Sequence, residues 1–198
     1  MAVELEHPFT ADKVGALRMG QTVSLSGTVF TARDRLHRHL ADGGDCPVNL
    51  GEGAVYHCGP VVVRREGVWS VRAAGPTTSL RHEAYMPGLI AKHRLRVIIG
   101  KGGMGEGTRA ACARCGCVYL QAVGGAASLL AARVERVEAV HFLDEFGPAE
   151  ALWVLQVRNF EAVVTIDAKG RSLHKRVKTV SKRALRNVLS EKRAGADR

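Results

Sequence analysis

Short runs of apolar residues alternate with segments of helical periodicity along most of this chain. Apolar or alternating runs predict strands, and apolar positions three and four residues apart predict helices. The predicted strands are Thr22–Phe30, Val61–Val63, Val97–Ile99, Cys117–Ala122, Val137–Phe142, Leu152–Arg158 and Val163–Asp167. The predicted helices are Thr10–Leu17, Ala32–Ala41, Glu83–His93, Gly105–Arg114 and Ala126–Val134. This mixture of strands and helices predicts an α/β fold.

The loops between these segments are rich in glycine and mark the ends of the predicted elements. Thr10 precedes the first predicted helix, where a threonine hydroxyl can cap free amide groups, and Gly20 follows its end. Several glycine-rich loops stand where a strand ends and a helix begins. Because ligands of α/β proteins bind at such junctions, we expect function to reside in these loops.

Positive charge is concentrated at the C-terminal end of the chain. The 198 residues carry a net charge of +10, but residues 171–198 alone hold ten lysines or arginines against two acids. Apolar residues in this segment recur at helical spacing: Val177, Val180, Ala184, Leu185 and Val188. We therefore expect one domain over residues 1–174 and a basic, helical tail over residues 175–198. The tail has no aromatic residue to stack on single strands, which favours docking on a partner or solvation over nucleic-acid binding.

The cysteines and the apolar segments bear on the compartment and on metal binding. Five cysteines, an odd number without a regular framework, indicate free thiols in a reducing compartment, so a cytoplasmic protein is expected. No run of about 18 apolar residues occurs, and the N-terminus lacks the apolar stretch of a secretory signal. Cys112 and Cys115 form a single CxxC pair close to Cys117, whereas a structural zinc site usually needs a second pair. We expect buried thiols here rather than a metal site.

Three consecutive hydroxyl residues follow a Gly-Pro turn in the segment Gly75–Arg81. Hydroxyls and backbone amides near a helix start favour an anion, and a guanidinium can bind a carboxylate with two hydrogen bonds. Thr77 and Arg81 are the candidates for such a site. An ordinary helix cap with a solvent-exposed arginine accounts for the same residues equally well.

An apolar strand-like run leads into the loop Gly100–Gly105, which contains four glycines and one lysine, Lys101. Glycines let the backbone approach a ligand closely, and a buried strand would hold the lysine at the carboxyl edge of the sheet. The spacing matches neither a Walker A loop nor the dinucleotide-binding fingerprint. A tight turn is the alternative, although lysine among so many glycines is poor turn chemistry.

Arg33 stands at the start of the helix predicted after Thr22–Phe30. A cation in a first helical turn opposes the helix dipole, which points to a functional reason for this arginine. Thr31 can cap the same helix. A solvated helix face explains the segment as well.

Taken together, these segments resemble the class I fumarate hydratase and L(+)-tartrate dehydratase family, in its C-terminal domain or separate beta subunit. The resemblance runs from His7 to His174 and rests on three strings in order, which are Thr31-Ala-Arg-Asp34, Gly75-Pro-Thr-Thr-Ser79 and Gly100-Lys-Gly-Gly-Met104. Shorter matches lie at Tyr56–Pro60, Val118–Leu120, Gly124–Ala127, Glu150–Trp153 and Val164–Gly170. The chain departs from the family's pattern at Leu36, His82, Glu83 and Glu161, which leaves the identity of the substrate open.

The resemblance implies a swivelling β/β/α domain of the class I fumarase C-terminal type. It also implies an alpha subunit that carries a [4Fe–4S] cluster, so no metal ligand is expected in this chain. The assembly would be α2β2, or a homo-oligomer when the chain is isolated. By motif, the residues that bind substrate carboxylates would be Arg33, Arg81 and Lys101. Thr77 would abstract a proton, assisted by an aspartate of the partner. The supporting loop residues would be Thr78, Ser79, Gly100, Gly102 and Gly103.

The activity that the resemblance implies is the reversible hydration of fumarate to malate, a step of the tricarboxylic acid cycle, by a subunit that is inactive without its partner. The chemistry suits this division, because a hydroxyl is a poor leaving group that needs a Lewis-acidic iron. A threonine hydroxyl alone is also too weak a base. Fixed cations would stabilise the negative charge that develops on the substrate. Two alternatives stay open, namely an L(+)-tartrate dehydratase beta subunit and a non-catalytic protein that binds small carboxylates.

Overall fold

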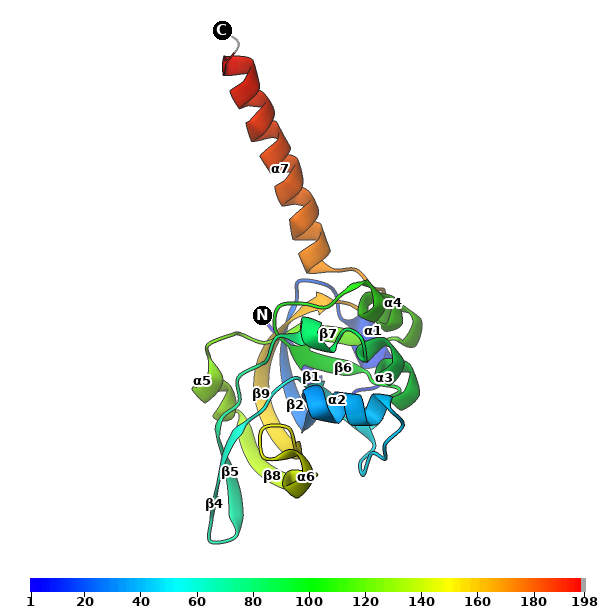
Figure 1. The fold of residues 1–198 in the computed structure, drawn as a ribbon, viewed down its shortest axis with the longest axis vertical. Coiled ribbons are helices and arrows are strands. Elements are labelled where there is room, and N and C mark those ends of the chain that lie inside the picture. Colours follow the sequence, from blue (N-terminus) through cyan, green and yellow to red (C-terminus); the bar gives the residue numbers. More distant parts are fainter. Residues whose placement is uncertain (197–198) are drawn as a thin grey trace.

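Strand β9 (Leu152–Ile166) organises the fold, because it pairs antiparallel with three other strands in the computed structural model, which describes residues 1–196. Its partners are β2 (Thr22–Thr31), β7 (Val118–Gln121) and β8 (Val134–His141). Parallel pairing connects, in spatial order, β1 (Val3–Glu6), β2, β3 (Ala54–Tyr56), β6 (Val97–Gly100) and β7. Since β9 pairs with both β7 and β2, the sheet closes into a barrel-like arrangement (Figure 1).

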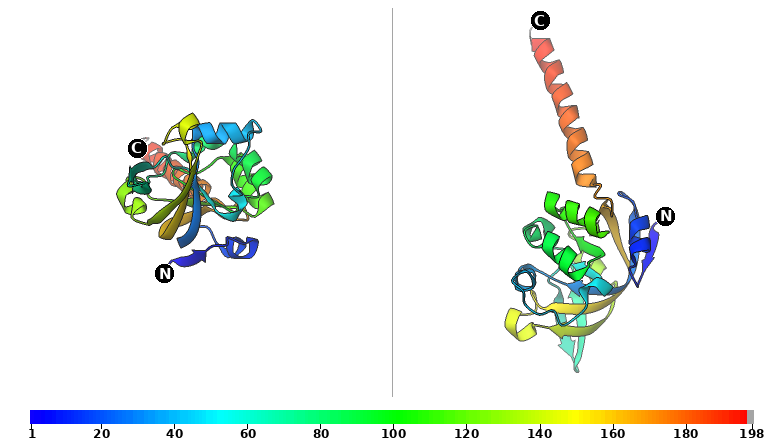
Figure 2. Two further views of the ribbon diagram at one scale, coloured as in Figure 1. Left: turned by 90° about the horizontal axis from the view of Figure 1, so that it is seen from below. Right: turned by 90° about the vertical axis from the view of Figure 1, so that its right-hand side faces the viewer.

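Each face of this sheet packs against an apolar core, because successive side chains of a strand point to opposite faces. In β6, Val97 and Ile99 belong to one core and Ile98 belongs to the other. The second core is covered by three helices, α2 (Asp34–Ala41), α3 (Met86–His93) and α4 (Glu106–Cys115). These helices lie together on one side of the sheet (Figures 1 and 2). The loops that precede α2 and α4 begin where β2 and β6 end, at the carboxyl edge of the sheet.

The remaining described elements are short, apart from the last helix. They are α1 (Ala11–Ala16), η1 (Leu50–Glu52), β4 (Val61–Arg65), β5 (Val68–Ala73), η2 (Ser79–His82), α5 (Ala127–Ala131), α6 (Leu143–Phe146) and α7 (Leu173–Ala196). Strands β4 and β5 form a separate hairpin. The hairpin and α7 extend from opposite ends of the body (Figure 1).

The α/β class and most of the predicted elements are confirmed. The strand predicted over Thr22–Phe30 is β2, and that over Val97–Ile99 is β6. The predicted cap of α1 is present, since the Lys13 amide donates to the Thr10 hydroxyl at 3.3 Å. In β2 and β6 the apolar residues of the sequence are buried in the fold.

Several predicted boundaries are wrong for identifiable reasons. Leu152–Arg158 and Val163–Asp167 are parts of one strand, because β2 pairs on both sides of Asn159, where β9 takes a positive φ of 51°. The helix predicted from Glu83 begins at Met86, after the 3-10 turn η2. The helix predicted over Ala126–Val134 ends at Ala131, since Val134 already pairs in β8. The sequence pattern missed β1, β3, β5 and α6, which are short or only partly buried.

Helix α7 covers the basic C-terminal segment and projects away from the body (Figures 1 and 2). Its apolar side chains, Val177, Val180, Leu185, Val188 and Leu189, are each more than half exposed. At its base, a Cβ on Gly103 would lie 2.9 Å from the His174 ring, so the helix begins against the glycine-rich loop. None of the helices within residues 1–196 combines the length and apolar character that crossing a bilayer requires.

We predict that deleting residues 175–198 changes the free energy of unfolding by less than about 1 kcal/mol, because exposed side chains and surface ion pairs contribute little. The ion pair lost would be Lys175 with Glu106, at 3.6 Å on the surface. Urea unfolding of the full and shortened chains measures the difference. As a control, Phe160→Ala removes a buried ring from β9 and should cost about 3–5 kcal/mol. A deletion that costs more than about 2 kcal/mol would contradict the independence of residues 1–174.

Candidate active site

The predicted site segments converge on one edge of the sheet, where parallel strands β2, β3 and β6 end. Arg33 follows β2, His57 follows β3, and Lys101 follows β6. The Gly75–Arg81 segment crosses this edge and is tied to it by backbone bridges, from Pro76 to Cys58 and from Thr78 to Lys101. Carboxyl ends of parallel strands commonly carry the ligand site of α/β proteins. The structure thus brings the three predicted segments together.

The buried hydroxyl of Ser79 connects the two loops at the centre of this edge. Its Oγ accepts from the Tyr119 hydroxyl at 2.8 Å and from the Lys101 amide at 3.2 Å. The same oxygen lies 2.8 Å from Nδ1 of His57, and its one proton is then available for that nitrogen. The Ser79 amide in turn donates to the Lys101 carbonyl at 3.0 Å. Lys101 is therefore held at the sheet edge through Ser79.

Thr77, the predicted proton-abstracting residue, is half-buried and bound to the end of β3. Its amide and its hydroxyl both donate to the His57 carbonyl, at 2.7 and 3.2 Å. The hydroxyl proton is thereby directed at a carbonyl of this chain. Its orientation is fixed by backbone rather than by a flexible side chain.

The two predicted arginines each have a carboxylate partner within the chain. The Arg81 guanidinium pairs with Asp34, the first residue of α2, and remains 55% exposed. Arg33 Nε lies 3.4 Å from Glu150 Oε1, and its side chain is 23% exposed. No carboxylate whose side chain is described pairs with Lys101. The edge thus presents two arginines of partly neutralised charge beside one lysine.

The start of α2 is capped differently from the prediction that Thr31 caps it. The helix begins at Asp34, and the Thr31 hydroxyl instead donates to the Ala151 carbonyl and accepts from the Trp153 amide. Glu150 supplies the cap from a distant loop, because its Oε2 accepts from the Arg35 amide at 2.9 Å. A carboxylate at this end also offsets the unfavourable placement of Arg33 in the helix dipole.

Glu83 closes the corresponding end of α4. Its carboxylate accepts from the amides of Gly105 and Thr108, at 2.7 and 3.0 Å, and from the Thr108 hydroxyl at 2.7 Å. The free amides of this helix start are therefore occupied by a residue of the chain, and α4 itself is not an anion site. Glu83 entered the sequence analysis only as a departure, because its partner lies 22 residues away.

Three buried histidines lie beneath the site, and the sequence analysis missed them as a group. The ring centroids of His37 and His82 are 4.4 Å apart, those of His57 and His82 4.6 Å, and those of His37 and His57 5.0 Å. Burial lowers the pKa of all three, that of His37 to about 3. The signal available in the sequence was that His37 follows Arg33 by one helical turn and His57 closes a strand. The rings are neutral at physiological pH.

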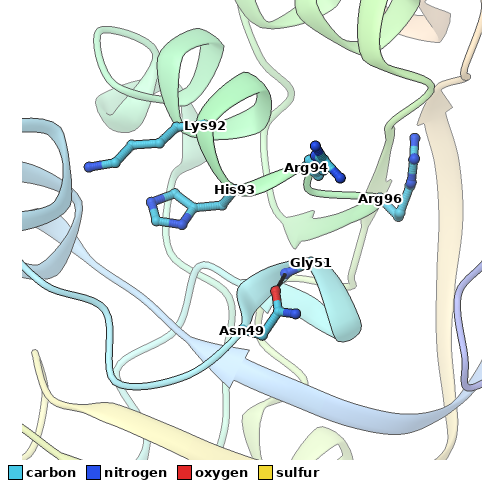
Figure 3. A pocket seen from close by; sticks show the side chains of 6 residues that line it. All are labelled: Asn49, Gly51, Lys92, His93, Arg94 and Arg96. Carbon is cyan, nitrogen blue, oxygen red and sulfur yellow. Dashed lines mark hydrogen bonds between the residues drawn. The ribbon is translucent and has the colours of Figure 1, made fainter.

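A pocket of about 420 Å³ lies at the opposite end of β6 and is lined by Asn49, Gly51, Lys92, His93, Arg94 and Arg96 (Figure 3). Two of its cations have structural partners, since Lys92 donates to the Leu40 carbonyl at 3.2 Å and Arg96 to the Cys115 carbonyl at 2.6 Å. These carbonyls end helices α2 and α4, where positive charge is favourable. The pocket holds none of the predicted site residues, and its charge is explained by helix termini.

Comparison with known proteins identifies the family. The sequence model of the family described as "Fumarase C-terminus" matches residues 1–177. The chain belongs to the fumarase C-terminus family. The sequence resemblance to class I fumarate hydratases and L(+)-tartrate dehydratases is thereby confirmed.

Relatives within this family differ in length. A putative fumarate hydratase class I of Geobacillus stearothermophilus is 45% identical over 180 residues, which is 90% of this chain and 35% of that protein. A putative L(+)-tartrate dehydratase subunit beta of Methanocaldococcus jannaschii is 38% identical over 173 residues, covering 85% of this chain and 89% of that one. The L(+)-tartrate dehydratase subunit beta of Escherichia coli is 35% identical over 171 residues, covering 85% of each. The chain thus spans about a third of the first relative and most of the other two.

The cysteines of this fumarase C-terminus chain are its candidate ligands for an iron–sulfur cluster. All five are free thiols, and Cys58, Cys112 and Cys117 are buried. Burial raises the pKa of Cys58 to about 12, and it also raises that of Cys117. Within residues 1–196, no three histidines, cysteines or carboxylates are arranged to hold a metal ion. The described residues therefore do not fit an iron–sulfur cluster.

We predict that Gly100→Ala destabilises the protein by about 1–3 kcal/mol, because a Cβ at this position would overlap the buried Ser79 hydroxyl. Gly88 offers the matched control, since a Cβ there meets nothing within 4 Å and Gly88→Ala lies inside α3. The control should be stabilising by about 0.5–1 kcal/mol. Chemical unfolding measures both. Equal effects of the two substitutions would rule out crowding at Ser79.

We predict that the free energy of unfolding falls as the pH is lowered from 7 to 5. The folded-state pKa of His37, His57 and His82 lies below the unfolded value of about 6.5, so the unfolded chain takes up protons that the folded chain excludes. Each ring contributes up to about 1.4 kcal/mol per pH unit. His82→Leu should lower this slope, as measured by urea unfolding at several pH values. A slope identical to that of the unmodified chain would contradict the neutral state of His82.

Proposed function

We propose that this chain is the beta subunit of an iron–sulfur-dependent hydro-lyase that reversibly hydrates fumarate to malate. The observation that carries the proposal is the convergence of Arg33, Thr77, Arg81 and Lys101 at one sheet edge, from three segments that are separate in sequence. Cationic groups beside a fixed hydroxyl suit a small dicarboxylate. The printed names of the relatives, fumarate hydratase class I and L(+)-tartrate dehydratase subunit beta, support the same reaction class.

In the proposed reaction the cations serve the transition state. Removing a proton next to a carboxylate concentrates negative charge on that carboxylate, and fixed cations in a closed site stabilise it. Lys101 is held by backbone hydrogen bonds through Ser79 and has no described carboxylate partner, so its charge is free for the substrate. Arg81 presents a half-exposed guanidinium whose planar donors match a carboxylate. Asp34 and Glu150 keep the two arginines from repelling each other when no substrate is bound.

Thr77 would receive or deliver the proton, and its surroundings favour a carboxylate supplied by a partner chain. A threonine hydroxyl needs a carboxylate to accept its proton. Three carboxylates that contact the site segments or lie next to them are already engaged, because Asp34 pairs with Arg81, Glu150 caps α2, and Glu83 caps α4. We therefore propose that the accepting aspartate belongs to an alpha subunit.

The same reasoning assigns the [4Fe–4S] cluster to that alpha subunit, because the described cysteines of this chain do not fit one. A Lewis-acidic iron would bind the hydroxyl that leaves the substrate. We propose that the domain is of the swivelling β/β/α type and closes the shared site. The assembly would be α2β2, or a homo-oligomer when the beta chain is isolated. Five free thiols suit a reducing compartment such as the cytoplasm.

A second candidate is an L(+)-tartrate dehydratase beta subunit. The observation in its favour is length, because the chain covers 89% and 85% of two beta-subunit relatives but only 35% of the fumarate hydratase relative. Tartrate differs from malate by one hydroxyl, so the same cations would bind both carboxylates. Rates of the reconstituted pair on malate and tartrate distinguish the two. A non-catalytic carboxylate-binding protein would instead bind malate with micromolar affinity without any partner.

We predict that the chain alone is inactive and that co-expression with a cluster-bearing alpha subunit yields fumarate hydration. In that complex, Arg81→Ala and Lys101→Ala should each lower kcat/KM by about 10²–10³, the cost of removing one fixed charge-stabilising donor. Arg65→Ala, which removes an exposed cation from the β4–β5 hairpin, should leave kcat/KM unchanged. Steady-state kinetics measure all three. Normal turnover by the Arg81→Ala complex would refute the assignment of the site.

A further inference from the structure

The three buried histidines come from three segments that lie beside the proposed substrate residues. His37 comes from α2, His57 follows β3, and His82 ends η2, so no two of them share an element. All three side chains are at least 99% buried. The imidazole rings thus bring α2, the end of β3 and η2 into contact with one another. None of these contacts is used by the reaction as described above.

Each histidine is linked to a different proposed substrate residue, through its ring, its backbone carbonyl or its place in the chain. His37 Nδ1 lies 2.7 Å from the carbonyl of Arg33. The His57 carbonyl accepts both hydrogen bonds of Thr77, while its ring binds the Ser79 hydroxyl. His82 directly follows Arg81 in the chain.

His82 also faces the ion pair of Arg81. Its Nδ1 lies 3.6 Å from Oδ1 of Asp34, while the other oxygen of that carboxylate pairs with Arg81. The His82 ring packs beside the Asp34 carboxylate and thereby restricts where the Arg81 guanidinium can lie. A change at His82 would therefore reach Arg81 both along the chain and through Asp34.

The arrangement of the rings is that of packed aromatic groups rather than of metal ligands. His37 and His82 are stacked with an interplanar angle of 22°, and His57 meets His82 edge to face at 61°. Among the described residues, these histidines do not form a group that could hold a metal ion. Nε2 of each ring has no hydrogen-bond partner among the described residues, which disfavours burial of these rings. The contacts between the ring faces and edges offset part of this cost.

We propose that His37, His57 and His82 are positioning residues, whose packed rings fix Arg33, Thr77 and Arg81 relative to one another. This inference rests on the proposed function for its kinetic consequences. Its structural consequence, restraint of the loops that carry Thr77 and Arg81, does not depend on catalysis. A misplacement of about 1 Å in a reacting group can lower the rate on the order of 100-fold. Loss of a histidine ring that holds the site loops should therefore lower the activity.

The first test compares His82→Ala with His82→Phe. Phenylalanine retains a flat ring against His37, whereas alanine removes it. In the reconstituted complex, His82→Ala should lower kcat for malate about tenfold with KM within about threefold, because Arg81 loses its placement against the transition state while Thr77 keeps its bonds to the His57 carbonyl. His82→Phe should restore kcat to within about threefold of the unmodified complex. Equal kcat values for both variants and the unmodified complex would overturn the proposal.

The second test needs no activity and separates this proposal from the proposed function. Amide hydrogen exchange of the isolated chain reports on the Thr77 and Lys101 amides, which bond to His57 and Ser79. His57→Phe keeps a ring but removes the nitrogen at Ser79, and it should speed exchange at Lys101 at least tenfold. The Val118 amide, bonded to the Arg96 carbonyl, is the internal reference, and His93→Ala is the matched control in a histidine outside the cluster.

The outcomes of the second test are distinct. Faster exchange at Lys101 in His57→Phe, with Val118 unchanged, supports positioning even if no hydro-lyase activity is found. Unchanged exchange at Thr77 and Lys101 in both His57→Phe and His82→Ala overturns the proposal. If His82→Ala does not fold, His57→Phe and His82→Phe decide the question by the same measurement.

Discussion

The antiparallel pairing of β9 with β2 is the constraint on which the rest of the structure depends. It joins the last strand to an early one and closes the ring of strands β2, β3, β6, β7 and β9, while in the described part of the chain β1 and β8 each pair on one side only. The closure fixes where β2, β3 and β6 end, and hence where Arg33, His57 and Lys101 stand. It also buries Trp153 and Phe160, whose removal from water is a large favourable term. The candidate site is a consequence of this closure rather than of any single loop.

The cations at the two ends of β6 differ in whether their side chains have partners within the chain. At the amino end, Lys92 and Arg96 pair with carbonyls that terminate helices, and their charge stabilises the fold. At the carboxyl end, Lys101 is positioned by hydrogen bonds to its backbone while its side chain lacks a described carboxylate partner. Arg33 and Arg81 are intermediate, since each shares a carboxylate that also contacts a helix start. The end proposed to bind substrate is the one at which a lysine has no described carboxylate partner.

The hydrogen bonds of three carboxylates bear on the proposal that the site is completed by a second chain. The carboxylates of Asp34, Glu83 and Glu150 are each bound by cations or amides of the same chain. They hold the site in shape, and a carboxylate so engaged is poorly suited to take a proton from Thr77. The chain is therefore built to position charge and a hydroxyl, and the proposed partner would supply the acceptor. The buried, neutral histidines fit this role, because they join loops without adding charge below them.

Local sequence determined a great deal about this protein. The apolar periodicity of Thr22–Phe30 and Val97–Ile99 predicted strands that are present, and the three motif strings predicted the family. The candidate residues Arg33, Thr77, Arg81 and Lys101 were also identified from sequence, because glycines, hydroxyls and cations at strand ends are local signals. What the tertiary structure alone decided are the contacts between distant residues. Glu150 rather than Thr31 caps α2, Asn159 continues a strand instead of ending one, and three histidines meet under the site. Such contacts depend on sheet closure, which pairs residues as far apart as Thr22 and Val163, 141 positions, in one register, and no local pattern encodes that distance.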